Sequence, residues 1–141
     1  MAKWLLAATG AVVTVAPPAP AQTPPPLDTV IARARSAWLA HDTRALMAAS
    51  DTVRLRIPGV AASAAARAGQ AARLLSEHFD AATELAFELR ELRYVDTDHA
   101  YAEFIRRYAV RGTTAALQET VFLGFRQVEG RWRLREVRIA P

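Results

Sequence analysis

The chain has 141 residues, of which 52% are hydrophobic, and its formal net charge is +4 at pH 7. It contains no cysteine, which excludes disulfides, thiolate metal sites, thiol catalysis and a lipidated leader. The length allows one domain, and the small excess of arginine over acidic residues is far from the clustered basic surface that nucleic acid recognition requires.

The first 21 residues have the three parts of a secretory signal peptide. Lys3 supplies the positive charge, a largely apolar run extends from Leu5 to Ala16, and Ala19-Pro20-Ala21 forms a small-residue cleavage site. The run is shorter than the roughly 20 residues of a membrane-spanning helix, so we favour cleavage near Ala21-Gln22 over an uncleaved anchor. This predicts an exported protein, periplasmic or secreted, with no membrane contact after cleavage.

The segment after the leader is rich in proline, and helical patterns follow it. Residues 22–26 are expected to form an extended linker before a single domain at 27–141. The apolar spacing from Leu27 to Ala40 predicts an amphipathic helix, with Asp28 and Thr29 capping its start.

A second, short helix is predicted from its capping residue Asp42 to Ala49. Residues 51–58 alternate Val53, Leu55 and Ile57 with polar residues, which predicts a half-buried strand. The alanine-rich segment Val60–Gly69 has no decisive pattern, so its structure stays open. A further helix is expected from Gln70 to Ala82.

The second half of the domain is predicted to be strand. Four strands are expected at 84–95, 100–111, 116–128 and 131–140. The first has Leu85, Phe87 and Leu89 on one buried face before a slip in register brings in Leu92 and Tyr94. Asp96 to His99 and Glu129-Gly130 are expected to be tight turns.

The last strand contains a change of phase. Val137 and Ile139 do not alternate in step with Trp132 and Leu134, which predicts a β-bulge near Arg135-Glu136. Trp132 is expected to be mostly buried where this strand closes the sheet against the helices. Helices followed by hairpin-linked strands predict an α+β fold, in which a curved antiparallel sheet has the N-terminal helices packed on one face.

Two stretches of the sequence resemble nuclear transport factor 2-like and SnoaL-like domains, which have a cystatin-like layout. The first includes Ala37-Trp38, Asp42, Leu46, Asp51 and Val53, and the second is the closing Gly130-Arg131-Trp132-Arg133-Leu134 with Val137 and Ile139. Gln70-Ala71, Leu74-Leu75 and His78-Phe79 are similar to the middle helix of a bacterial family, domain of unknown function 4783. His78 replaces a phenylalanine of that family, and the Tyr-Ser-Lys element that usually precedes Gln-Ala is absent.

The resemblance implies a pocket between the helices and the sheet. The candidate pocket-lining residues are Trp38, His78, Phe79, Phe87, Phe104 and Phe125. The resemblance includes enzymes of the ketosteroid isomerase type, which have this layout. They use a carboxylate base and a tyrosine hydrogen-bond donor from the first helix. The first helix of this chain has no tyrosine, so we assign no catalytic residue.

Other polar patterns are interpreted as structural. Asp96-Thr97-Asp98-His99 could hold a metal, but paired aspartates at this position are typical of a turn. We therefore expect no metal and no cofactor. Arg131, Arg133 and Arg135 alternate onto one face of the last strand and could receive an anionic ligand. We favour a solvated sheet face on which they pair with Glu119 and Glu129.

Residues Val121-Phe122-Leu123-Gly124-Phe125 are apolar on both faces of their strand. Such a strand is either central and covered twice, or part of a homodimer contact through the sheet.

Two functional hypotheses follow. The first is a non-catalytic binding or interaction module that takes a small apolar ligand or a protein partner. The alternative is a SnoaL-like pocket enzyme of the isomerase, dehydratase or cyclase type, with His78 or a pocket carboxylate as general base. An enzyme needs an ionisable group that faces its pocket, whereas a binding module needs only apolar walls.

Export is directly testable. Protein recovered from the exported fraction is expected to begin at Gln22, because the small residues before it fit signal peptidase, and intact-mass measurement checks this. Retention of Met1, or recovery only from the cytoplasm, contradicts the prediction.

Overall fold

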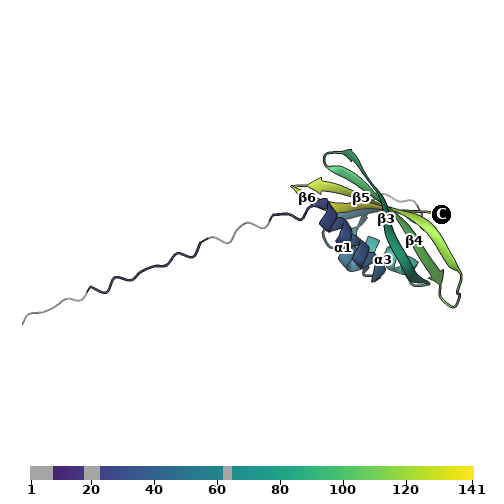
Figure 1. Ribbon diagram of the computed structural model, residues 1–141, viewed down its shortest axis with the longest axis horizontal. Coiled ribbons are helices and arrows are strands. Elements are labelled where there is room, and N and C mark those ends of the chain that lie inside the picture. Colours follow the sequence, from purple (N-terminus) through teal and green to yellow (C-terminus); the bar gives the residue numbers. More distant parts are fainter. Residues whose placement is uncertain (1–7, 18–22, 62–64) are drawn as a thin grey trace, which may run out of the picture.

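The computed structural model describes residues 8–17, 23–61 and 65–141. Residues 8–17 and 23–26 belong to no helix or strand, and residues 8–17 lie away from the folded part of the chain (Figure 1). Lys3, the predicted cleavage site at Ala19–Ala21 and part of the alanine-rich segment lie outside the described residues. Within those residues, no helix is both long and apolar enough to span a membrane.

The domain is one mixed sheet with helices on one face (Figure 1). The elements are α1 (Leu27–Leu39), α2 (Thr43–Met47), β1 (Thr52–Arg56), β2 (Ala66–Arg67), α3 (Ala68–Phe79), β3 (Ala82–Asp96), β4 (His99–Val110), β5 (Ala116–Val128) and β6 (Arg131–Ala140). The strand order is β2-β1-β6-β5-β4-β3. The predicted fold class is confirmed, and one strand pair, β1 with β6, is parallel. The last residues of the alanine-rich segment, whose structure the sequence left undecided, form β2 and the start of α3.

The two first helices begin in different ways. α1 starts after Pro26 and has no side-chain cap, so the predicted capping by Asp28 and Thr29 is wrong. Asp28 lies inside the first turn, where its charge still favours the positive end of the helix dipole. α2 begins as predicted, because the backbone N–H of Ala45 donates to Oδ1 of Asp42 at 3.0 Å.

Strand β3 departs from simple alternation. Its pairing with β4 shifts register between Glu84 and Ala86, so Leu85 is an extra, bulged residue. The bulge places Glu84 and Phe87 on the same, helix-covered face, although their spacing would otherwise put them on opposite faces. Leu85 and Leu89 are 53% and 46% exposed, so their predicted burial is wrong, whereas Phe87 is fully buried. Leu85 is turned away by the bulge.

The bulge in β6 is confirmed. Gly124 pairs with Glu136 and Phe125 pairs with Leu134, which leaves Arg135 as the extra residue. Leu134, Val137 and Ile139 consequently all face the core. The preceding turn is tight because Glu129 and Gly130 both have positive φ, 53° and 76°.

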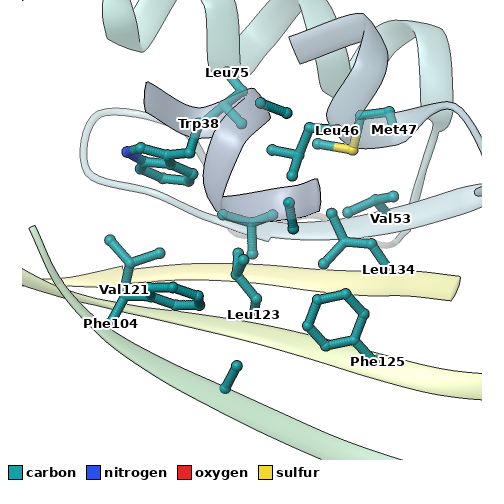
Figure 2. Close-up of a cluster of buried hydrophobic side chains, with 14 of the residues drawn as sticks. Trp38, Leu46, Met47, Val53, Leu75, Phe104, Val121, Leu123, Phe125 and Leu134 are labelled. Atoms are coloured by element: carbon teal, nitrogen blue, oxygen red, sulfur yellow. The ribbon is translucent and has the colours of Figure 1, made fainter. Parts of the chain in front are cut away.

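The core extends along the concave face of the sheet. Figure 2 shows Trp38, Phe104 and Val121 at one end, and Phe125, Leu134 and Met47 towards the other. Trp38, Phe104, Val121 and Leu123 are fully buried. The two ends of this interior differ in chemistry, and that difference defines the candidate sites.

The outer face of the sheet is closely packed at Gly124. A Cβ atom there would lie 2.9 Å from Cε1 of Tyr101 and 3.1 Å from Cβ of Glu136. In contrast, a Cβ added at Gly69 in α3 meets nothing within 4 Å.

Two glycine substitutions test this packing. Gly124→Ala is expected to lower the free energy of unfolding by about 1–3 kcal/mol, because the methyl group overpacks a tight contact. Gly69→Ala is the matched control and is expected to raise it by about 0.4–1 kcal/mol through the unfolded state. Chemical denaturation measures both changes. Equal effects of the two substitutions would show that the outer face can relax around a methyl group.

Candidate functional site

A buried arginine links three strands at one end of the interior. Arg106 of β4 is 1% exposed. Its Nη1 donates to Oε1 of Glu119 in β5 at 2.6 Å. Its Nε donates to both carboxylate oxygens of Glu84 in β3, at 2.9 and 3.1 Å, and its Nη2 also donates to Glu84. The Glu84 and Glu119 side chains are only 3% and 8% exposed, so all three charges are removed from solvent together.

Two histidines extend this ionic group towards the surface. His41, between α1 and α2, places Nε2 3.0 Å from Oε1 of Glu84. His78 of α3 places Nε2 3.4 Å from Nη1 of Arg106 and 3.9 Å from Oε1 of Glu119. The imidazole of His78 therefore turns towards the sheet, as its helix position predicts. We call these five residues the Arg106 cluster.

Aromatic rings enclose the Arg106 cluster. The guanidinium carbon lies 5.7, 5.4 and 4.2 Å from the ring centroids of Trp38, Phe79 and Tyr108. The His41 ring stacks on Phe79 at 4.3 Å, with an interplanar angle of 6°. His41 holds this position with φ = 53°, a left-handed conformation that is uncommon for a residue with a side chain. The contacts of its ring offset that backbone cost.

Burial and pairing act in opposite directions on the charges. Burial raises the pKa of Glu119, but its polar contacts with His78 and Arg106 outweigh burial and leave the pKa below its ordinary value. Burial lowers the pKa of Arg106, but hydrogen bonds to Glu84 and Glu119 outweigh it and raise the pKa. Because the folded-state pKa of Glu119 is depressed, its ionised form stabilises the fold at neutral pH, and this contribution is lost as pH falls through the folded-state pKa.

The two carboxylates of the Arg106 cluster are shielded from solvent, whereas the His41 and His78 side chains are partly exposed. Arg106 donates to both oxygens of Glu84 and to one oxygen of Glu119, and the carboxylates have almost no exposed surface. A general base needs a lone pair within hydrogen-bond reach of its substrate. The geometry fits an internal brace that joins three strands and three helix ends.

The sequence interpretation missed this cluster. Glu119 was expected to pair with arginines of the solvated face, which is wrong, because Glu119 lies directly opposite Arg106 and faces inward. Arg106 shares the alternation phase of Phe104, a predicted pocket-lining residue, and Glu119 shares that of the apolar Val121, so the strand pattern itself contained a signal. The sequence pattern gave no signal that Glu84 faces inward, because its inward position depends on the bulge at Leu85.

The predicted pocket-lining aromatic residues lie in the packed interior. Trp38 stacks on Phe87 at 4.6 Å, and Phe87 stacks on Phe104 at 4.2 Å. Phe79 meets the edge of Trp38 at 4.8 Å. These four form one aromatic stack beside the Arg106 cluster, whereas Phe125 lies at the other end of the core (Figure 2).

The interior opens at that other end. A hollow of about 950 Å³ lies between α1, α2 and the β5–β6 hairpin. We call it the hairpin hollow. Its apolar lining is Val30, Ala34, Leu46, Phe125, Trp132 and Leu134. Trp132 is partly buried and packs against the core, which agrees with the prediction that it is mostly buried. Its remaining exposed surface lines the hollow, and its ring meets Tyr94 edge-on at 6.4 Å.

Charged groups surround the hairpin hollow. Arg33, Arg131, Arg133 and Asp51 contribute to its lining. Nη1 of Arg133 donates to Oδ2 of Asp51 at 3.1 Å, which pairs the one acidic residue of the lining. Thr23 and Pro25, from the segment before α1, complete one wall.

The outer sheet face is more polar than its sequence suggested. Phe122 is half-buried under the guanidinium of Arg138, 4.1 Å from the ring centroid. Tyr101 covers Gly124 and donates from its hydroxyl to Oε2 of Glu136 at 3.1 Å. Burial, followed by the Glu136 charge, raises the pKa of Tyr101. A homodimer through this face stays a prediction.

The turn at Asp96 to His99 forms as predicted. The backbone N–H of Asp98 donates to Oδ1 of Asp96 at 3.0 Å, and Asp96 pairs with His99 across the hairpin. In the part of the chain that the structure describes, no group of three or more potential ligands could hold a metal ion.

No family model and no curated protein matches the chain. Several solved structures, in contrast, are similar to this chain. A domain of unknown function 4783 family protein from Bacteroides uniformis is 17% identical, with TM-score 0.64, covering 77% of this chain and 93% of that chain. A ketosteroid isomerase-like protein from Erwinia carotovora atroseptica is 18% identical, with TM-score 0.62, covering 81% and 94%.

A nuclear transport factor 2-like protein of unknown function from Shewanella oneidensis is 11% identical, with TM-score 0.56, covering 82% of this chain and 96% of that chain. The fold of this chain is therefore nuclear transport factor 2-like, with structural neighbours in the domain of unknown function 4783 family. At these identities the likeness shows the fold alone, and it confirms the resemblance predicted from the sequence at that level.

Substitutions in the Arg106 cluster test its structural role. Arg106→Met is expected to lower the free energy of unfolding at pH 7 by about 3–5 kcal/mol, because it removes the guanidinium that pairs with two buried carboxylates. The loss should shrink as pH falls and the carboxylates take up protons. The triple variant Arg106→Met, Glu84→Gln, Glu119→Gln is expected to recover most of the stability. If Arg106→Met alone leaves the free energy of unfolding unchanged at pH 7, the cluster does not brace the fold.

Proposed function

We propose that this chain is an exported, non-catalytic binding module whose ligand occupies the hairpin hollow. The observation that carries the proposal is the hollow itself, about 950 Å³ between the helices and the sheet. Ligand sites are typically concave spaces of about 300–1,000 Å³ with mainly apolar walls. The leader supports export.

The walls of the hairpin hollow suit an apolar ligand. Phe125 and Leu134 form its floor and are 1% and 4% exposed. The half-buried Trp132 provides a broad apolar surface with one polar atom. Such rings contribute large contact areas to binding sites at a small cost in side-chain entropy.

The alternative of a pocket enzyme has weaker support. His78 and the two inward carboxylates belong to the Arg106 cluster, and the carboxylates already accept hydrogen bonds from Arg106. The hairpin hollow is lined at the opposite end of the core by Phe125 and Leu134 (Figure 2). Its one acidic residue, Asp51, is paired with Arg133 and 75% exposed at its side chain, so no buried carboxylate faces the hollow from the lining residues.

Binding of a neutral apolar fluorophore tests the proposal. N-phenyl-1-naphthylamine is expected to bind the mature protein saturably at one site, with a rise in fluorescence as it leaves water. Ala49→Trp places a large ring at an exposed position of the hollow lining and should weaken binding at least about tenfold, a change of about 1.4 kcal/mol.

The matched control is Gln118→Trp, which adds the same ring at an exposed position of β5. It should leave binding unchanged. Non-saturable binding by the unmodified protein, or equal affinities of the two tryptophan variants, contradicts the assignment of the hollow as the site.

A further inference from the structure

We propose that the ligand of the hairpin hollow is an amphiphilic anion, with an apolar body against Phe125 and Leu134 and one acidic group held by Arg33 and Arg131. This inference rests on the proposed function and specifies its ligand class. Carboxylate, sulfonate and phosphate groups share the chemistry that a guanidinium recognises, a planar or tetrahedral set of acceptor oxygens.

The charge of the lining is the first support. Three arginines and one aspartate contribute to the hollow. Asp51 is paired with Arg133 at 3.1 Å, so the lining carries a net charge of about two positive units, from Arg33 and Arg131. Among the described residues, no ion pair joins either of these two arginines to a carboxylate of the chain.

The placement of the two arginines is the second support. Arg33 belongs to α1 and Arg131 begins β6, so the positive charges come from the helix wall and from the sheet wall. Both residues are exposed, whereas Phe125 and Leu134 at the floor are buried. A ligand that enters with its apolar end first would leave its acidic end level with the guanidinium groups.

The spacing along α1 connects these two features. Val30, Arg33 and Ala34 all line the hollow, at positions i, i+3 and i+4 of one helix face. Val30 and Ala34 therefore contact the ligand body on the same face that presents the cation. Long arginine side chains pack their methylene groups along apolar surface while the charged end stays in water. One helix face thus supplies both halves of an amphiphile site.

Two matched fluorophores test the ligand class. 8-Anilinonaphthalene-1-sulfonate has the same ring system as N-phenyl-1-naphthylamine and adds one sulfonate. The unmodified protein is expected to bind the sulfonate about tenfold more tightly, since charge-assisted hydrogen bonds exceed neutral ones. The double variant Arg33→Gln, Arg131→Gln should lose that preference about tenfold while its affinity for the neutral probe stays unchanged.

The control is Arg107→Gln, Arg111→Gln, which removes the same total charge from exposed positions at the far end of β4 and beyond it. It should retain the preference for the sulfonate. Equal binding of both probes by the unmodified protein, or equal losses in the two double variants, overturns the inference. If the neutral probe still binds saturably in those cases, the proposed binding function stands, but its ligand need not be an anion. If neither probe binds saturably, the proposed function itself fails.

Discussion

The pairing of one buried guanidinium with two buried carboxylates sets the arrangement of the domain. Arg106 is 1% exposed, and a charge so far from water must be matched by opposite charge and by hydrogen bonds. Glu119 meets this requirement from directly across the β4–β5 pair, and Glu84 meets it from β3 only because of the bulge at Leu85. A slip of one residue in either pairing would turn a carboxylate outward and leave the arginine uncompensated. The cluster therefore specifies the register of three strands.

The same cluster fixes the helices relative to the sheet. His41 lies at the corner between α1 and α2, contacts Glu84 at 3.0 Å and stacks on Phe79 of α3. His78 reaches the cluster from the end of α3. The left-handed backbone of His41 is retained because these contacts determine where its ring lies. Three helix ends and three strands thus converge on one polar centre, with the stack of Trp38, Phe87 and Phe104 beside it.

This arrangement divides the interior into a closed end and an open end. At the closed end, charges and rings satisfy one another and leave the carboxylates almost no surface for a substrate. At the open end, α1, α2 and the β5–β6 hairpin diverge around an apolar floor. The structural neighbours share the fold, and one of them is described as ketosteroid isomerase-like. A shared fold hosts unrelated activities. The function of this chain therefore depends on its own side chains, those of the hairpin hollow included.

The sequence by itself determined the main helices and strands and their order, because these depend on local periodicity, whereas β2 and the bulge at Leu85 were not predicted. The strands β5 and β6, the bulge at Arg135, the cap at Asp42 and the hairpin turns all follow from neighbouring residues. Tertiary structure alone decided the Arg106 cluster and the hairpin hollow, since each joins residues far apart in the chain. Glu84 faces inward because of one bulged residue opposite β4, and Trp132 lines a hollow that residues of α1 and α2 help to form. Periodicity predicts which face a side chain occupies, but the partner on that face is set by how the elements pack.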